Sequence, residues 1–288
     1  MSEPLPITPL VAVPLTVTPV GPTIGARVTG IDLGRPLAAE TLEELARLLV
    51  HHQVLFFENQ PLTPARQRTF AAGFGPLHVH PVYPSVPDFP EIMVLDTGPH
   101  NPTDNDVWHS DVTFLEAPPA IVALSAKVIP PIGGDTLWSS AFAAYEALSE
   151  PLRRLLDPLE AVHDFTRSFP EWRHNKPGVY ERWLEARSRN PVRCHPVVRT
   201  HPVNGRKALF VNENFTAHIV GLSARESDGI LRILFDHVTR PEFTVRWSWK
   251  PDDLALWDNR STQHYAVNDY LPHRRLMHRA TVLGDRPV

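Results

Sequence analysis

Apolar residues recur along the chain at two spacings, one typical of helices and one typical of strands. Leucines at helical spacing between residues 39 and 52 predict an amphipathic helix that packs on a sheet. The apolar run 54–57 predicts a buried strand directly after it. Thr63 followed by Pro64 predicts the start of a second helix, and Gly75 is its expected C-terminal cap.

The rest of the chain continues this pattern and contains more strands than helices. Apolar and β-branched runs predict strands at 92–95, 107–114, 120–129, 135–138, 195–201, 208–211, 243–249 and 275–283. Helical spacing predicts helices at 140–159, with breaks near Pro151 and Pro158, and at 223–239. We find no internal repeat and no domain boundary, so residues 1–288 are expected to form one domain, mainly β with flanking helices.

Three stretches lack a regular period. Residues 78–84 are rich in proline and histidine and predict a loop, and loops on a rigid scaffold often carry binding groups. Residues 161–193 are aromatic and charged, which is typical of a long excursion that forms an active-site lid. Pro4 to Pro22 predicts an extended N-terminal segment.

Composition then narrows the function classes. Hydrophobic residues make up 42% of the 288 residues and charged residues 21%, so a sizeable core is expected. A net charge of -4 without a basic patch argues against nucleic acid as a partner. No segment predicts a membrane span, and the first 22 residues contain no Lys or Arg and several prolines, which argues against a signal peptide. Cys194 is the single cysteine, which excludes an internal disulfide and favours a reducing, cytoplasmic location.

A histidine and an aspartate two residues apart suggest a metal site. On an extended strand, His109 and Asp111 would leave the same face, where a ring nitrogen and a carboxylate oxygen can reach one ion. A His-x-Asp pair is expected about once by chance in a chain this rich in histidine, so a third ligand is needed, and His264 is the candidate. Two histidines and one carboxylate leave positions open on iron(II) for an organic co-substrate and dioxygen. Zinc is less suited, because its sites are closed or keep one water.

Two arginines on the last predicted strand suggest anionic ligands. Arg275 and Arg279 share one face of that strand, and they are four residues apart, which at strand rise is roughly 13 Å. Two arginines in one pocket repel each other and are costly to bury unpaired, so the pocket favours two anions. The planar guanidinium of Arg275 suits the far carboxylate of a 2-oxo acid, and Arg279 suits the acidic group of a substrate. The alternative is that each arginine pairs with an Asp or Glu of the chain.

The chain resembles the iron(II)- and 2-oxoglutarate-dependent dioxygenases, and within them the taurine dioxygenases of bacteria, from about Ile7 to Pro287. The resemblance rests on His78-Val79-His80-Pro81-Val82-Tyr83-Pro84, Trp108 to Phe114, Gly133 to Trp138, His163-Asp164-Phe165 with Ser168-Phe169-Pro170, Trp257 to His264, and Arg275 to Gly284. It implies a double-stranded β-helix, or jelly roll, that assembles as a homodimer or homotetramer. It also implies Fe(II) on the three ligands, with 2-oxoglutarate and O2 as co-substrates.

The resemblance also implies roles for single residues. Thr136 is expected to support 2-oxoglutarate together with Arg275, and Arg279 and His80 are expected to hold a sulfonate. The further implied substrate contacts are Tyr83, Asn105, Val112, Ser168, Phe169 and Phe215. The implied reaction hydroxylates taurine, a small sulfonate, at the carbon next to sulfur. It releases sulfite and aminoacetaldehyde, with succinate and CO2.

Three other functions remain open at this point. A related dioxygenase acting on other alkylsulfonates, alkyl sulfates or aryloxyacetates would share the metal ligands and both arginines. A zinc hydrolase would need a positioned carboxylate base, and the sequence shows no evident one. A β-barrel that only binds a small anion would need no metal. The histidines of loop 78–84 can also be read as solvated surface groups, and Phe169 and Phe215 as ordinary core residues.

Overall fold

The computed structural model describes residues 15–80, 83–101, 103, 105–175 and 178–288. Pro81 and Val82 of the predicted loop lie outside the described residues, as do the first fourteen residues, which include most of the predicted N-terminal segment. No helix in the described part of the chain combines the length and apolar character that a membrane crossing requires.

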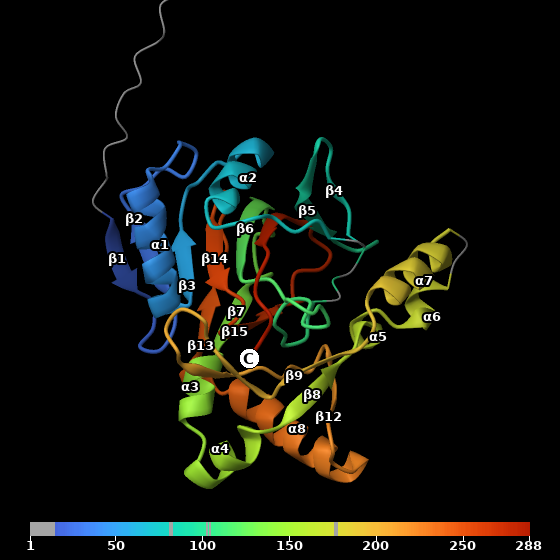
Figure 1. Ribbon diagram of the computed structural model, residues 1–288. Coiled ribbons are helices and arrows are strands. Elements are labelled where there is room, and N and C mark those ends of the chain that lie inside the picture. The colour runs from blue at the N-terminus through green and yellow to red at the C-terminus, as the bar shows by residue number, and fades with distance from the viewer. Residues whose placement is uncertain (1–14, 81–82, 102, 104, 176–177) are drawn as a thin grey trace, which may run out of the picture.

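Sixteen strands and eight α-helices make up the described part of the chain (Figure 1). The strands are β1 (Thr16–Pro19), β2 (Ala26–Thr29), β3 (Val54–Phe57), β4 (Ser85–Val86), β5 (Phe89–Thr97), β6 (Ile121–Val128), β7 (Thr136–Ser140), β8 (Glu160–His163), β9 (Arg193–Pro196), β10 (Val198–Thr200), β11 (Lys207–Leu209), β12 (Thr216–Ile219), β13 (Thr244–Trp247), β14 (Leu254–Asp258), β15 (Thr262–Ala266) and β16 (Arg275–Val282). The helices are α1 (Ala39–His52), α2 (Pro64–Ala72), α3 (Ala141–Glu146), α4 (Glu150–Leu156), α5 (Phe165–Ser168), α6 (Glu171–His174), α7 (Tyr180–Arg189) and α8 (Ala224–Val238), with a 3₁₀ turn η1 (Pro241–Phe243).

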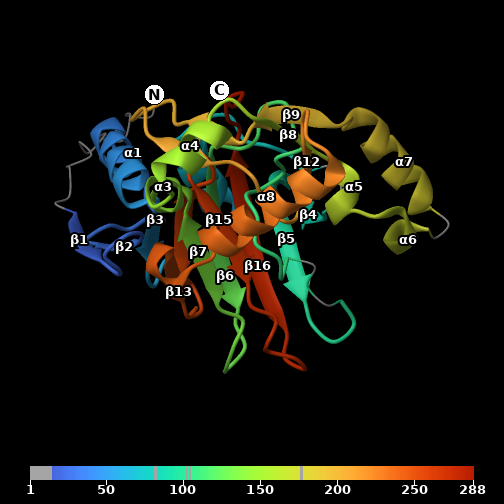
Figure 2. The ribbon, with the colours of Figure 1, turned by 90° about the horizontal axis from the view of Figure 1, so that it is seen from below.

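Two sheets pack face to face around the site. The larger sheet has the order β1-β2-β3-β14-β6-β16-β5-β4, and the smaller one the order β13-β7-β15. Alternate residues of β6 face opposite sides: Val122 and Leu124 pack with Trp138 of the smaller sheet, whereas Ala123 packs with apolar residues of α1 and α2. The large sheet therefore carries the small sheet on one face and helices on the other, as the two views show (Figures 1 and 2). The predicted jelly-roll fold, mainly β with flanking helices, is confirmed.

Several predicted elements are confirmed, and one predicted helix cap needs correction. The helix at 39–52 and the strand at 54–57 have the predicted bounds, and Thr63 caps α2 by accepting a hydrogen bond from the Arg66 N–H. Gly75 is not the cap of α2, because the helix ends at Ala72 and Gly73 closes it. The predicted helix 140–159 is broken near Pro151 as expected: α4 begins there, with the proline in its first turn, and it ends at Leu156, before Pro158.

The predicted lid region begins and ends in a sheet. β8 and β9 pair antiparallel, β12 joins β8 on its other edge, and the chain between β8 and β9 contains α5, α6 and α7. These helices lie on the side of the molecule away from α1 (Figures 1 and 2). The first helix of this region, α5, packs on the turn that follows His109. Phe165 and Phe169 stack with ring centroids 4.8 Å apart, and both contact Phe114 in that turn.

Candidate active site

His109 and His264 face each other across a short antiparallel bridge. Each residue donates its backbone N–H to the carbonyl of the other, at 3.0 Å from His109 and 2.8 Å from His264. Directly opposed residues of an antiparallel pair project their side chains from the same face. The two imidazoles consequently lie side by side, with ring centroids 4.1 Å apart.

The predicted strand at 107–114 is wrong, because the chain turns after this bridge. Residues 111–114 form a turn, and Leu115 N–H donates to the Val112 carbonyl at 3.0 Å. Val112 has a φ of 42°, a left-handed conformation that is strained for a β-branched residue. Asp111 therefore reaches the histidines through a turn and not through the alternation of a strand.

Three ligand atoms nevertheless converge on one point. Asp111 Oδ1 lies 3.6 Å from His109 Nε2 and 3.8 Å from His264 Nε2. One ligand atom from each residue lies within 4.8 Å of the other two, and all three side chains are buried. Metal–ligand bonds of about 2.0–2.2 Å fit separations of this size. The predicted ligand set is thus brought together by the structure.

The protonation of these groups also suits a cation. His109 Nδ1 lies 2.7 Å from the Val107 carbonyl, so that nitrogen carries a proton and Nε2 is the nitrogen that faces Asp111. Burial, reinforced by the neighbouring His109, holds the pKa of His264 well below its usual range. Burial of the Asp111 carboxyl opposes ionisation, but Arg279 and the two imidazoles outweigh it and hold its pKa well below the usual range. The triad therefore offers a neutral His264 and an ionised Asp111 beside the ring nitrogen of His109.

Arg279 is paired within the site. Its guanidinium forms an ion pair with Asp111 Oδ2, the carboxylate oxygen that is not shared with the histidines, and its Nε–H donates to Thr281 Oγ1 at 3.2 Å. The alternative that Arg279 pairs with an acidic residue of the chain is therefore seen in the structure, and its contact with a substrate acid stays a prediction. The guanidinium still lines the cavities on both sides of the triad.

Arg275 differs, because the described residues give it no acidic partner. It is buried, and its hydrogen bonds run to the Gly134 carbonyl at 3.0 Å and to Thr136 Oγ1 at 3.3 Å. Burial lowers the pKa of Arg275 to about 10, because its charge is removed from water without an acidic partner among the described residues. Thr136 Oγ1 also accepts from Trp249 Nε1 at 2.9 Å, so its own O–H remains available to donate. A carboxylate placed here would meet two donors.

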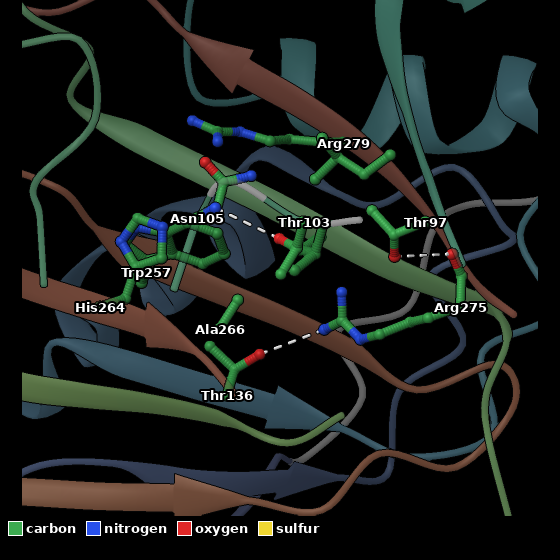
Figure 3. A pocket seen from close by; sticks show the side chains of 11 residues that line it. Thr97, Thr103, Asn105, Thr136, Trp257, His264, Ala266, Arg275 and Arg279 are labelled. Carbon is green, nitrogen blue, oxygen red and sulfur yellow. Dashed lines mark hydrogen bonds between the residues drawn. The ribbon is translucent and has the colours of Figure 1, made fainter. Parts of the chain in front are cut away.

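The first cavity connects this arginine to the triad. Figure 3 shows His264 on one side and Arg275 with Thr136 on the other, with Trp257 and Arg279 along the walls. Leu95, Leu124 and Ala266 supply the apolar part of the lining. A small dicarboxylic acid fits this arrangement of charges, with one end at the metal point and the other at Arg275.

The second cavity lies on the other side of the triad. It contains all eight residues expected to contact the substrate, namely His80, Tyr83, Asn105, Val112, Ser168, Phe169, Phe215 and Arg279. His109 and Asp111 line it as well, so a molecule held here would lie next to the metal point. The structure brings these residues together, while the role of each stays a prediction.

His80 is a neutral hydrogen-bond donor in this cavity. Its Nδ1 accepts from the Tyr83 N–H at 3.2 Å, so the ring proton of the neutral form is on Nε2. Burial, followed by the positive charge of Arg279, lowers the pKa of His80 to about 3. A neutral N–H from His80 and a charged N–H from Arg279 are both suited to the oxygens of an anionic substrate.

Sequence reasoning missed four residues around the site. Met93 and Asn214 line the second cavity, Trp249 orients Thr136, and Asn259 holds the backbone of Asp111. Asn259 lies inside the segment 257–264 that carried the resemblance, but no pattern indicated which group it would contact. Met93 and Trp249 were assigned to predicted strands only. Such roles depend on contacts between distant segments, which spacing along the chain does not report.

Comparison with known proteins places these features in a family. The model of the taurine catabolism dioxygenase TauD, TfdA family matches residues 16–281. The chain belongs to this family. An alpha-ketoglutarate-dependent sulfate ester dioxygenase of Pseudomonas putida is 41% identical over 280 residues, 96% of this chain and 92% of that protein. An alkylsulfatase of Acinetobacter baylyi is 39% identical and covers 91% of this chain and 83% of its own length.

Solved structures of the TauD, TfdA family agree in fold. A taurine dioxygenase from Burkholderia xenovorans superposes with a TM-score of 0.81 at 36% identity, covering 95% of this chain and 92% of that one. The chain is an alpha-ketoglutarate-dependent, that is 2-oxoglutarate-dependent, dioxygenase of this family. These relatives are named for different substrates: sulfate esters, alkyl sulfates and taurine. The substrate of this chain therefore has to be argued from its own site.

Proposed function

We propose that this protein is an iron(II)- and 2-oxoglutarate-dependent dioxygenase that oxidises short alkyl sulfate esters at the carbon bearing the sulfate. The observation that carries the proposal is the position of Arg279 and neutral His80, two hydrogen-bond donors that line the cavity beside the triad opposite apolar side chains. A sulfate group offers several oxygen acceptors to such donors. Alkylsulfonates, taurine among them, are the second candidate, since a sulfonate presents the same oxygens.

The relatives support the sulfate ester over taurine. The two proteins compared above at 41% and 39% identity are named for sulfate ester and alkylsulfate chemistry, and the taurine dioxygenase from Burkholderia xenovorans is 36% identical. The walls formed by Val112, Phe169 and Phe215 are apolar and suit a methylene chain. Taurine itself therefore stays a prediction, and the sulfate ester is the better supported substrate.

The residues of the triad fit iron(II). Their two imidazole nitrogens and one carboxylate oxygen form the ligand set that non-haem iron oxygenases use, with positions left for a co-substrate and dioxygen. Bound iron(II), with 2-oxoglutarate and dioxygen, supplies the oxidising power that replaces one C–H bond of the substrate by C–OH.

The side chains of the protein supply binding and orientation. Arg275 and Thr136 hold the distal carboxylate of 2-oxoglutarate, which neutralises the buried guanidinium. Arg279 and His80 hold the sulfate, so the carbon attached to its ester oxygen lies toward the metal point. The surrounding phenylalanines exclude water, and the excursion 161–193, which contributes Ser168 and Phe169, is proposed to cover this cavity.

The overall reaction balances. One oxygen atom of O2 enters the substrate as hydroxyl and the other enters succinate, while 2-oxoglutarate loses CO2. The hydroxylated carbon then carries both OH and the sulfate oxygen, so its C–O bond to sulfate breaks as the hydroxyl loses its proton. The products are an aldehyde, hydrogen sulfate, succinate and CO2. With an alkylsulfonate the C–S bond breaks instead and releases sulfite.

The experiment measures succinate formed from 2-oxoglutarate with hexyl sulfate, taurine or 2,4-dichlorophenoxyacetate under Fe(II) and ascorbate. We expect succinate with hexyl sulfate in a one-to-one ratio to released sulfate, and a lower kcat/KM with taurine. Sulfate release that needs neither dioxygen nor 2-oxoglutarate would instead indicate a metal hydrolase. Absence of succinate with every sulfate ester and sulfonate would refute the proposed substrate class.

Substitution of two nearby arginines, Arg279 and Arg274, tests whether Arg279 binds the sulfate. Arg279→Gln should lower kcat/KM for hexyl sulfate by about 10²-fold or more, because a charged hydrogen-bond donor to the substrate is lost. Arg274→Gln is the control, since that arginine is exposed and pairs with Asp96 at the surface. Equal activity of the two variants would contradict the role of Arg279. Mn(II) affinity is measured in parallel, because Arg279 also contacts Asp111.

A further inference from the structure

The backbone around Asp111 needs partners that the sheets do not provide. The His109–His264 bridge is isolated, and the chain turns away from β15 immediately after it. The peptide groups of Asp111 are nevertheless buried. Buried backbone N–H and C=O groups must be hydrogen-bonded, so another group has to replace the missing strand.

Asn259 provides these hydrogen bonds with its side-chain amide. Its Oδ1 accepts from the Asp111 N–H at 2.7 Å, and its Nδ2–H2 donates to the Asp111 carbonyl at 3.3 Å and to the Pro119 carbonyl at 3.0 Å. Asn259 is 1% exposed, so water does not compete for these groups. One amide thus contacts both ends of residue 111, as a neighbouring strand would, and ties it to the segment before β6.

The turn that carries Asn259 is held by hydrogen bonds of its own. Its own N–H donates to the Ala120 carbonyl at 2.8 Å. The preceding residue, Asp258, accepts from Arg260 Nε at 2.9 Å and lies 3.0 Å from His201 Nε2, and all of these side chains are buried or nearly so. The turn between β14 and β15 therefore presents the amide of Asn259 from a rigid base, just before the metal-ligand His264.

The hydrogen bonds from Asn259 lie directly beside a strained turn at Val112. Val112 adopts its left-handed conformation directly after Asp111, and such a conformation persists only where the surrounding structure holds it. We propose that Asn259 is a positioning residue that holds Asp111 and its strained turn in the metal-binding arrangement. The inference rests on the proposed metal site, because the positioning of Asp111 is judged by how tightly the triad binds a divalent ion.

Gln60 offers a matched control for removal of this amide. Its side chain is also buried, accepts from one backbone N–H (Leu33) and donates to two backbone carbonyls (Ile31 and Glu58), but it lies outside both cavities. Asn259→Ala and Gln60→Ala therefore remove equivalent sets of hydrogen bonds. Any general effect of lost stability should appear in both variants.

The test is a titration of the metal-free protein with Mn(II), with free Mn(II) followed by its EPR signal. We expect Asn259→Ala to raise the Mn(II) Kd by about 10-fold or more, the effect typical of groups that orient a metal ligand, and Gln60→Ala to leave it unchanged. An unchanged Kd in Asn259→Ala, or equal losses in both variants, would overturn the inference. Absence of Mn(II) binding by the unmodified protein would instead refute the proposed metal site.

A second variant covers the case in which Asn259→Ala does not fold. Asn259→Asp keeps the size of the side chain and an acceptor for the Asp111 N–H, but its carboxylate faces two carbonyl oxygens where Nδ2 had donated. The added negative charge alone would tighten binding of a cation. Weaker Mn(II) binding at pH 8 therefore supports positioning, and equal or tighter binding contradicts it.

Discussion

Arg275 lets the energetic account be tested through stability and binding together. Burial lowers the pKa of this guanidinium from its usual range to about 10, because it has no acidic partner among the described residues. At about 1.4 kcal/mol per pKa unit, holding the charge in the ligand-free protein costs about 3 kcal/mol. A base whose pKa is lowered by folding destabilises the protein at every pH below the folded pKa, so the full cost applies near neutrality.

Replacement of this arginine by glutamine therefore has two opposite effects. Arg275→Gln removes the buried charge, and it also removes hydrogen bonds to Gly134 and Thr136 worth about 1 kcal/mol each. We expect a ligand-free variant that is as stable as the parent protein or more stable by about 1 kcal/mol. The same change should weaken 2-oxoglutarate binding by about 3–4 kcal/mol, or about 10²–10³-fold, because the charged bonds to its carboxylate are lost.

The assay combines urea unfolding of the metal-free protein with titration of 2-oxoglutarate into the Mn(II)-loaded protein. Arg274→Gln serves as the control, because this neighbouring arginine is exposed and pairs with Asp96, and it should change neither quantity by more than about 1 kcal/mol. An Arg275→Gln protein that loses several kcal/mol of stability yet keeps its 2-oxoglutarate affinity would refute the role of Arg275 as an unpaired charge that 2-oxoglutarate neutralises.

Two further predictions address the support of the site. Trp249→Phe removes the hydrogen bond to Thr136 Oγ1 and should raise the KM for 2-oxoglutarate by roughly 5-fold with little change in kcat; a kcat loss without a KM change would contradict this. Folding lowers the pKa of both His80 and His163 to about 3. The metal-free protein should therefore lose stability as pH falls below about 6.5, by up to about 1.4 kcal/mol per pH unit for each histidine, until about pH 3. Urea unfolding at pH 7.5 and 5.5 should show a smaller decrease in the free energy of unfolding for His163→Gln than for the unmodified protein. An equal decrease in both would contradict the lowered pKa of His163.

Local patterns predicted the regular elements well, for a physical reason. The 39–52 helix has the bounds that its leucine spacing indicates, because an amphipathic face decides where such a helix packs. The face shared by Arg275 and Arg279 on β16 followed from the two-residue period of a strand, and both side chains line the first cavity. The set of substrate contacts came from resemblance, and the structure gathers all of it around the second cavity.

The failures occurred where distant segments override local preference. Val112 and its neighbours favour a strand by residue type, but the hydrogen bonds from Asn259 and the bridge to His264 impose a turn. The pairing of Arg279 with Asp111 was similarly hidden, because spacing along the chain does not say which of 32 acidic residues lies beside an arginine. The ligand atoms still converge, so the grouping of His109, Asp111 and His264 was predicted correctly from an incorrect local geometry.

Binding of iron(II) and 2-oxoglutarate at this site is tested most directly by anaerobic addition of 2-oxoglutarate to the protein loaded with one equivalent of Fe(II), followed by visible absorption. We expect a charge-transfer band that saturates at one 2-oxoglutarate per chain. The band should be absent from Asp111→Ala and should need at least 10²-fold more 2-oxoglutarate in Arg275→Gln. No band in the unmodified protein at saturating Fe(II) and 2-oxoglutarate, or an undiminished band in Asp111→Ala, would contradict binding at this site.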